Sequence, residues 1–288
     1  MAVEIGIILA IGALVFWGIE EFFLKKSIAR IGIHSTLLLN TITGIFVDIF
    51  LVYVVFSVSI SIISAVSFLI VLIVGFFLYA EYVFFYKALQ KQELSIVSTL
   101  DETWVLISVP IAIFVFGELL TPLHAFAIGC ALMGAFFISV NFKHVRKMKL
   151  ISGAKFEILS IAAAGISSPF IRIVTNDIGE FMAFFYLDAI IILFIAAHKL
   201  LGKTKYKKPN RRDLKIVVAS GLADGFAFAF FVLAIAYADI SVVTPIVAST
   251  ALVAVIFGRF ILKEKTTIYQ KIGIALVISA VVILANIA

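Results

Sequence analysis

The sequence of 288 residues is poor in charge, cysteine and histidine. Charged residues make up 14% of the chain, whereas about 25% is usual in soluble domains. The single cysteine, Cys130, excludes an intramolecular disulfide, and the four histidines form no HExxH zinc motif. The chain also lacks a nucleotide-binding glycine loop. These absences argue against an enzyme, and we expect no cofactor and no metal ion.

Hydrophobic residues, in contrast, make up 64% of the chain and recur in long runs. Runs of about 20 residues are long enough to cross a hydrocarbon core about 30 Å thick. The sequence therefore predicts an all-α polytopic membrane protein with ten transmembrane helices. The expected spans lie at about residues 3–24, 33–56, 62–86, 95–117, 121–141, 156–175, 181–201, 213–237, 241–262 and 267–287.

The sequence repeats itself with a shift of 146 residues. Segment 93–98, Glu-Leu-Ser-Ile-Val-Ser, matches segment 239–244, Asp-Ile-Ser-Val-Val-Thr, in its order of acid, aliphatic and hydroxyl residues. We therefore expect two homologous halves of five spans each, residues 1–148 and 149–288. Because five is odd, the halves must insert in opposite orientations. Inverted repeats of this kind are the architecture of many secondary transporters, which work by alternating access.

Several short motifs occur in the same order in both halves. Trp17-Gly18 lies in the first span, hydroxyl-rich segments open spans four and nine, and Pro245 lies within span nine. Glu118 and Glu264 precede spans five and ten. With these motifs the chain resembles the EamA-type permeases of the drug/metabolite transporter superfamily, although Thr99 stands where the second half has proline. The resemblance implies a carrier with a central cavity between its halves, often exporting amino acids or other small metabolites.

Acidic residues interrupt several of the expected spans. A charged side chain at the centre of a span costs about 2.5–3.5 kcal/mol even on lenient insertion scales, so its default interpretation is functional. The acids within spans outnumber the single basic residue, Arg172, which favours proton handling or a substrate with a cationic group. The candidate acids are Asp48, Glu81, Asp101, Glu102, Asp188 and Asp224.

The internal repeat indicates which of these acids share a face. Asp224 corresponds to Leu78, three residues before Glu81, so the two acids occupy one face of equivalent helices. Asp188 and Asp48 fall on one face by the same reasoning. Acids on equivalent faces of both halves are what a shared central cavity would collect.

Span four carries two of the acids side by side. Ser98 and Glu102 lie on one stripe of the expected helix, and Asp101 and Trp104 lie on the neighbouring stripe. Two adjacent acids cannot both ionise cheaply in a low dielectric, so one of them is expected to keep a proton near neutral pH. That property suits a proton-coupled carrier. Trp17 and Trp104 are further candidates for the wall of the cavity.

Some of these residues also have a structural interpretation. Arg172 fits a cap at a helix end or a pair with Asp177. Glu20-Glu21 lie one turn before Lys25-Lys26, a spacing that favours interfacial salt bridges. For the whole protein, the alternatives to a proton-coupled transporter of a small metabolite are an uncoupled facilitator and a non-transporting membrane scaffold.

Basic residues are distributed unevenly about the spans. The odd-numbered connections and their flanking turns hold 22 of the 23 Lys and Arg residues, with runs at 143–149 and 203–212. By the positive-inside rule these connections are cytoplasmic and both termini are outside, whereas EamA-type permeases usually keep their termini inside. Such flanks explain the net charge of +6 without nucleic-acid binding. We expect a multi-pass plasma-membrane protein whose partners are lipid, protons and a small-molecule substrate.

Overall fold

The computed structural model describes residues 2–59, 61–91, 94–139, 154–202, 206–250, 252–253 and 267–287. These residues are almost entirely helical, and no strand occurs among them. The predicted boundary between the halves, the basic run 143–149 and residues 203–205 of the second run lie outside the described residues. Glu93, Glu264 and the side chain of Thr99 lie outside them as well.

Within the described residues, six helices are long and apolar enough to cross a membrane. They are α1 (Ala2–Ile31), α2 (Ile33–Ile49) with a π-helical extension (Phe50–Val55), α3 (Ala65–Lys91), α7 (Ala154–Ile178), α8 (Glu180–Leu201) and α9 (Arg211–Tyr237). The shorter helices are α4 (Leu94–Asp101), a 3-10 turn (Glu102–Trp104), α5 (Val105–Phe116), α6 (Pro122–Ser139), α10 (Ile240–Val247) and α12 (Ile268–Ile287). The predicted helical membrane fold is therefore confirmed. The count of ten spans stays a prediction.

Glycines in the left-handed region end three of the helices. Gly32 (φ 79°) separates α1 from α2, and Gly179 (φ 85°) separates α7 from α8. Gly117 (φ 70°) follows α5, and its N–H bonds to the carbonyl of Ile113 at 3.1 Å. A side chain would strain the backbone at these angles, so glycine fixes where each helix stops. Gly32 and Gly179 make the first joint of each half in the same way.

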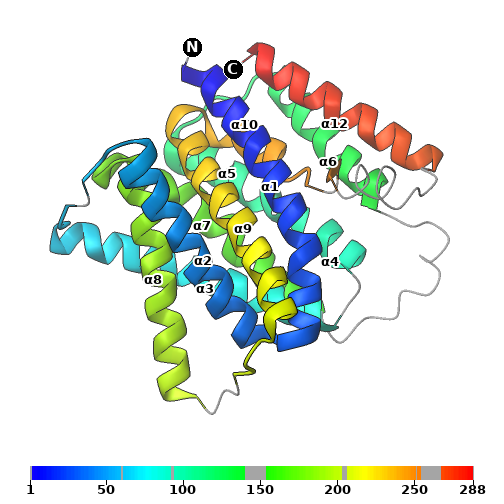
Figure 1. Cartoon of the computed structure of the whole chain (residues 1–288). Helices are drawn as coiled ribbons and strands as arrows, with labels where there is room; N and C mark the ends of the chain where they lie inside the picture. The colour runs from blue at the N-terminus through cyan, green and yellow to red at the C-terminus, as the bar shows by residue number, and fades with distance from the viewer. Residues whose placement is uncertain are drawn as a thin grey trace.

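The helices of the two halves interleave rather than forming separate bundles. The first helix of each half packs along the third helix of the other: α1 on α9, and α7 on α3. The second helices behave likewise, since α2 packs on α9 and α8 packs on α3. At one side α6 lies along α12, as Figure 1 shows. The hydrophobic core therefore runs between the halves, and residues near the middle of α1, α3, α7 and α9 meet inside the molecule.

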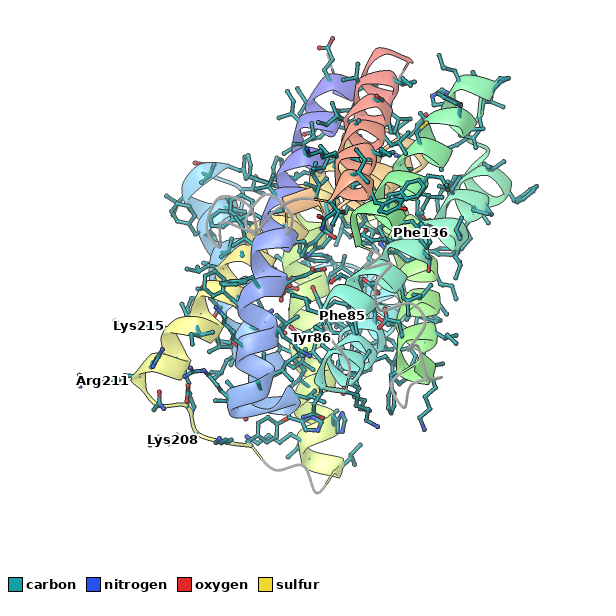
Figure 2. The ribbon with its side chains drawn as sticks, turned by 90° about the vertical axis from the view of Figure 1, so that its right-hand side faces the viewer. Phe85, Tyr86, Phe136, Lys208, Arg211 and Lys215 are labelled. Atoms are coloured by element: carbon teal, nitrogen blue, oxygen red, sulfur yellow. The ribbon has the colours of Figure 1, made fainter. Side chains whose placement is uncertain are left out.

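One end of the molecule is basic. Figure 2 shows Lys208, Arg211 and Lys215 gathered there, and all three are exposed. The segment that carries them is attached to the end of α1, because Arg30 pairs with Asp213 at 3.0 Å. We call this the basic end. The start of α1 lies about 40 Å away along the helix, at the opposite end.

Candidate functional site

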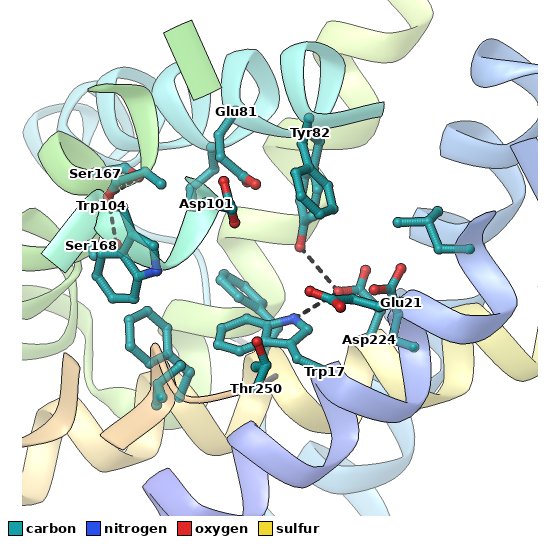
Figure 3. Close-up of a pocket in the computed structure, with 18 of the residues that line it drawn as sticks. Trp17, Glu21, Glu81, Tyr82, Asp101, Trp104, Ser167, Ser168, Asp224 and Thr250 are labelled. Carbon is teal, nitrogen blue, oxygen red and sulfur yellow. Dashed lines mark hydrogen bonds between the residues drawn. The ribbon is translucent and has the colours of Figure 1, made fainter. Parts of the chain in front are cut away.

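A cavity of about 100 Å³ lies between the two halves, near the middle of α1 and α9. Its lining comes from α1, α3 and the junction of α4 with the 3-10 turn in the first half, and from α7, α9 and α10 in the second. Figure 3 shows carboxyl, indole and phenol side chains gathered around it. No Lys, Arg or His is among the described residues that line it. The lining acids are Glu20, Glu21, Glu81, Asp101, Glu102 and Asp224.

Asp224 of α9 accepts hydrogen bonds from three neutral side chains of the first half. Its Oδ1 accepts from Trp17 Nε1 at 3.1 Å and from the Tyr82 hydroxyl at 3.4 Å, as Figure 3 shows. Its Oδ2 accepts from Asn40 Nδ2 at 2.9 Å. Asn40 in turn donates to the Tyr86 hydroxyl at 3.0 Å. The carboxylate is thus held without a basic partner, and its charge is available to a proton or a cationic ligand.

Glu20 and Glu21 of α1 also face the interior. Their exposed fractions are 4% and 8%, and each accepts a hydrogen bond from a serine. Ser220 of α9 donates to Glu20 Oε1 at 3.3 Å, and Ser98 of α4 donates to Glu21 Oε2 at 2.8 Å. The expected interfacial position of this pair is therefore wrong. The i,i+4 spacing of Glu21 to Lys25 was compatible with a surface face, but α9 meets Glu20 through Ser220 and α4 meets Glu21 through Ser98.

Asp101 and Glu102 lie where α4 gives way to the 3-10 turn, and both line the cavity. Their neighbours differ. The Thr250 hydroxyl of the second half donates to Glu102 Oε1, whereas the Asp101 carboxyl contacts that of Glu157 on α7. Glu157 is 1% exposed, and no donor in the described part of the chain bonds to its carboxyl oxygens. Two carboxylates this close would repel each other in a low dielectric, so the pair favours binding of a proton or a cation.

Asp48 and Asp188 form a second carboxyl pair, between α2 and α8. Their exposed fractions are 0% and 5%, and within the described ranges neither oxygen of Asp48 accepts a hydrogen bond from an amide, hydroxyl or cation. Gly44 makes room for the pair, because a Cβ there would lie 2.9 Å from Asp188 Oδ2. The two predicted residues therefore meet, as their shared face suggested. They lie beside the cavity and do not line it.

Arg172 lies near the end of the molecule opposite the basic end. Its Nη2 donates to the carbonyl of Ile235 at 2.8 Å and to that of Ala238. Its Nη1 lies 3.9 Å from Glu118 and 3.8 Å from Asp239. Arg172 is therefore a candidate for closing this end of the molecule, and it does not line the cavity.

Most of the predicted site residues thus converge, although their roles stay predictions. Those that line the cavity are Trp17, Glu81, Asp101, Glu102, Trp104 and Asp224. Ser98 does not line it but donates a hydrogen bond to Glu21, which does. Sequence reasoning did not name Tyr82 and Tyr86, which lie one turn apart on α3 and line the cavity together with Glu81. It also missed Thr250 and the buried Glu157. Among the described residues, no group of three or more His, Cys, Asp or Glu side chains is arranged to hold a metal ion.

Comparison with known proteins identifies the family. The model of the EamA-like transporter family matches the chain twice, at residues 4–140 and 151–286. This protein belongs to the EamA-like transporter family. The two matches cover nearly the whole of this EamA-like protein, one match in each predicted half, and confirm the sequence resemblance.

Solved structures share the fold. This EamA-like protein is similar to one described only as "Crystal structure of protein", with a TM-score of 0.76 at 18% sequence identity. The match covers 96% of this chain and 95% of the other. At that identity the likeness shows the fold alone. A search of curated proteins gives no match. Family membership makes this a multi-pass membrane transporter of small substrates and favours a non-enzymatic protein.

Proposed function

We propose that this EamA-like protein is a proton-coupled secondary transporter that moves a small metabolite with a cationic group, such as an amine or amino acid, by alternating access. The observation that carries the proposal is the cavity itself. It collects six carboxyl side chains from both halves and no basic side chain among its described lining residues. A site of that charge disfavours an anionic substrate. It suits protons and an ammonium group, which aromatic walls also attract through cation–π contacts.

Proton coupling follows from how the acids are grouped. Asp101 and Glu157 are in contact, and Glu81, Glu20 and Glu21 line the same small space. Several carboxylates cannot be charged together in a low dielectric, so protons or a cation must neutralise them. A cationic substrate that binds would then displace protons from the carboxyl groups. When the substrate leaves, the carboxyl groups would bind protons again. That exchange is the coupling step we propose.

The proposed mechanism rests on two inverted halves, residues 1–148 and 149–288. Reciprocal packing supports this arrangement, because exchanging the halves turns the α1–α9 contact into the α7–α3 contact and α2–α9 into α8–α3. Two similar halves that pack on each other in equivalent ways can exchange inward-facing and outward-facing arrangements about a central site. The cavity lies at that interface.

We further propose a plasma-membrane location with the basic end in the cytoplasm and both termini outside. The first prediction tests the orientation in cells. In a Cys130→Ser background, a cysteine introduced at Lys208 should resist an impermeant thiol reagent until the cells are permeabilised. A cysteine at Asp177 should be labelled in intact cells. Labelling of the Lys208 position alone in intact cells would reverse the proposed orientation.

Transport is tested by reconstitution. Purified protein in liposomes is screened for uptake of radiolabelled amines, amino acids and nucleoside-like compounds, with and without a pH gradient. The proposal expects accumulation of a cationic or zwitterionic compound that collapses when the pH gradient is dissipated. Uptake that only equilibrates and ignores the gradient would favour the uncoupled facilitator. No uptake of any compound above protein-free liposomes would favour the scaffold.

A further inference from the structure

Helix α10 begins without a cap of its own. Asp239 occupies the N-cap position but its side chain makes no capping hydrogen bond. The first N–H groups of a helix need acceptors, and a buried helix start without them is unfavourable. Every residue of α10 from Ile240 to Val247 is buried, so water does not supply the acceptors.

A carboxylate from the other half supplies them. Glu118, in the connection between α5 and α6, accepts from the N–H of Ile240 at 2.8 Å through Oε1 and from the N–H of Ser241 at 2.9 Å through Oε2. Its exposed fraction is 8%. Both of its oxygens are used, and the negative charge lies at the positive end of the helix dipole. The start of α10 is therefore held by the first half.

Arg172 strengthens the same junction. It lies beside Glu118 and Asp239 at 3.9 and 3.8 Å and also donates to the carbonyl of Ala238, just before α10. A space of about 130 Å³ lined by Arg172 and Asp239 adjoins it. The junction thus joins α7, the start of α10 and the α5–α6 connection close to the end of the molecule.

The other end of α10 reaches the cavity and is held there by the first half again. Val247, the last residue of α10, lines the cavity, and Thr250 just beyond it donates to Glu102. A short buried helix is thus fastened at both ends to carboxyl groups of the opposite half, Glu118 outside the cavity and Glu102 inside it.

We propose that α10 is the gate between the cavity and the end of the molecule opposite the basic end, and that Glu118 is the latch that keeps it closed. The inference goes beyond the proposed transport, since it names the element that opens. A ligand that takes over Glu102 frees the inner end of α10. Release of the two N–H bonds at Glu118 then lets its outer end move, which opens the cavity on that side only.

One part of this junction, the cation that donates to the end of the third helix, recurs at the basic end. A shift of 147 pairs Lys25 with Arg172, and a shift of 146 pairs Leu89 with Ile235. In the structure Lys25 Nζ donates to the carbonyl of Leu89, as Arg172 donates to that of Ile235. Equivalent cations therefore fasten the end of the third helix in each half, at opposite ends of the molecule.

The test measures access to the cavity and needs no substrate, so it stands even if proton-coupled transport fails. In a Cys130→Ala background, Val247→Cys places a reporter thiol in the cavity wall. An impermeant maleimide is added to right-side-out and to inside-out vesicles. Glu118→Ala should raise the labelling rate about tenfold from the face where residue 118 lies, which corresponds to about 1.4 kcal/mol, and leave the opposite face unchanged. Glu118→Gln, which keeps one acceptor oxygen, should give a smaller rise from the same face.

The matched control is Glu180→Ala. Glu180 is an acid near the same end that accepts from the Tyr237 hydroxyl at 2.9 Å, but both residues belong to the second half. Its loss should leave labelling unchanged from either face. The proposal is overturned if Glu118→Ala and Glu118→Gln leave the rate unchanged. Equal rises from both faces would also overturn it, since they would indicate general loosening of the fold.

Discussion

Each half has one broken helix at the cavity. The two helices follow the same backbone path but carry different side chains at the break. Helix α4 runs for eight residues and ends at Asp101, and α10 runs for eight residues and ends at Val247. These end points are one repeat apart in the sequence. The 3-10 turn that follows α4 corresponds to the turn at residues 248–250. Both halves therefore interrupt the same span at the same place.

Hydroxyl residues at equivalent positions accompany both interruptions. The Thr103 hydroxyl donates to the carbonyl of Leu100 at 2.6 Å, and the Ser249 hydroxyl donates to the carbonyl of Pro245 at 3.0 Å. Side-chain bonds of this kind compete with the regular ladder and bend helices. In α10, Pro245 adds to the effect by removing a backbone donor. A hydroxyl–carbonyl bond thus accompanies the break in each half, and proline is present at only one of the two breaks.

The side chains at the break are where the halves diverge. Asp101 and Glu102 stand in the first half, and Val247 and Ala248 stand at the corresponding positions of the second. The comparison teaches that duplication preserved the framework of the site while acid chemistry is concentrated on one of the two broken helices. Asp101 and Glu102 can therefore bind protons on the first half alone, because the corresponding Val247 and Ala248 of the second half have no titratable group.

The largest effect on transport is expected at Asp224, the acid that the second half contributes to the cavity lining. Asp224→Leu makes this position resemble its equivalent, Leu78, and leaves Trp17, Asn40 and Tyr82 without their acceptor. We expect transport to fall about a hundredfold or more. Stability in detergent should fall by about 1–3 kcal/mol for each buried donor left unpaired. Thermal melts and uptake assays measure the two effects.

Asp224→Asn is the matched variant for that prediction, because it keeps an acceptor oxygen and removes only the charge. It should melt close to wild type and still lose transport. Wild-type uptake by Asp224→Asn would show that Asp224 serves structure and that the one cavity-lining acid of the second half is not needed for transport.

A smaller effect, on stability, is expected from glycine substitutions in α3 and α9, the third helix of each half. Gly75 and Gly221 are equivalent, but a Cβ at Gly221 would lie 2.7 Å from the backbone oxygen of Asn40, whereas one at Gly75 would meet the Ile190 side chain at 2.6 Å. A side chain moves aside more easily than a backbone. Gly221→Ala should therefore lower unfolding stability by about 1–3 kcal/mol, and Gly75→Ala by about 1 kcal/mol or less. Equal losses in thermal melts would mean that the two interfaces are packed alike.

The smallest effect is expected at Asp101. Asp101→Asn removes one negative charge beside Glu157, so the remaining carboxyls give up protons more readily. The pH optimum of uptake should move to lower pH by on the order of one pH unit, with little loss of maximal rate. Uptake measured across a pH series gives the shift. If the optimum stays in place or moves to higher pH, Asp101 does not influence the group whose protonation sets the pH optimum.

Sequence periodicity and the repeat predicted a large part of this site. Apolar runs located the helices, and the repeat placed Glu81 and Asp224 on faces that do meet at the cavity. Rotation about each helix was harder to predict, because one residue of change turns a side chain by about 100°. Glu20 and Glu21 were assigned to the interface from their spacing to Lys25 and Lys26, but in the structure both are turned toward the interior. The partners of Asp101 and Glu102 come from α7 and from beyond α10, and no local pattern reports contacts between such distant segments.

The central claim is that the carboxyl groups of the cavity exchange protons for a cationic substrate, and we propose Glu102, on the broken helix of the first half, as the group that carries the transported proton. It is tested most directly by recording the internal pH of liposomes with a trapped dye while a transported substrate is added outside. Wild-type protein should change the internal pH in step with uptake. Glu102→Gln, which can still pair with Thr250, should exchange labelled for unlabelled substrate across the membrane without any pH change. If Glu102→Gln moves protons with substrate as the wild type does, the account is contradicted.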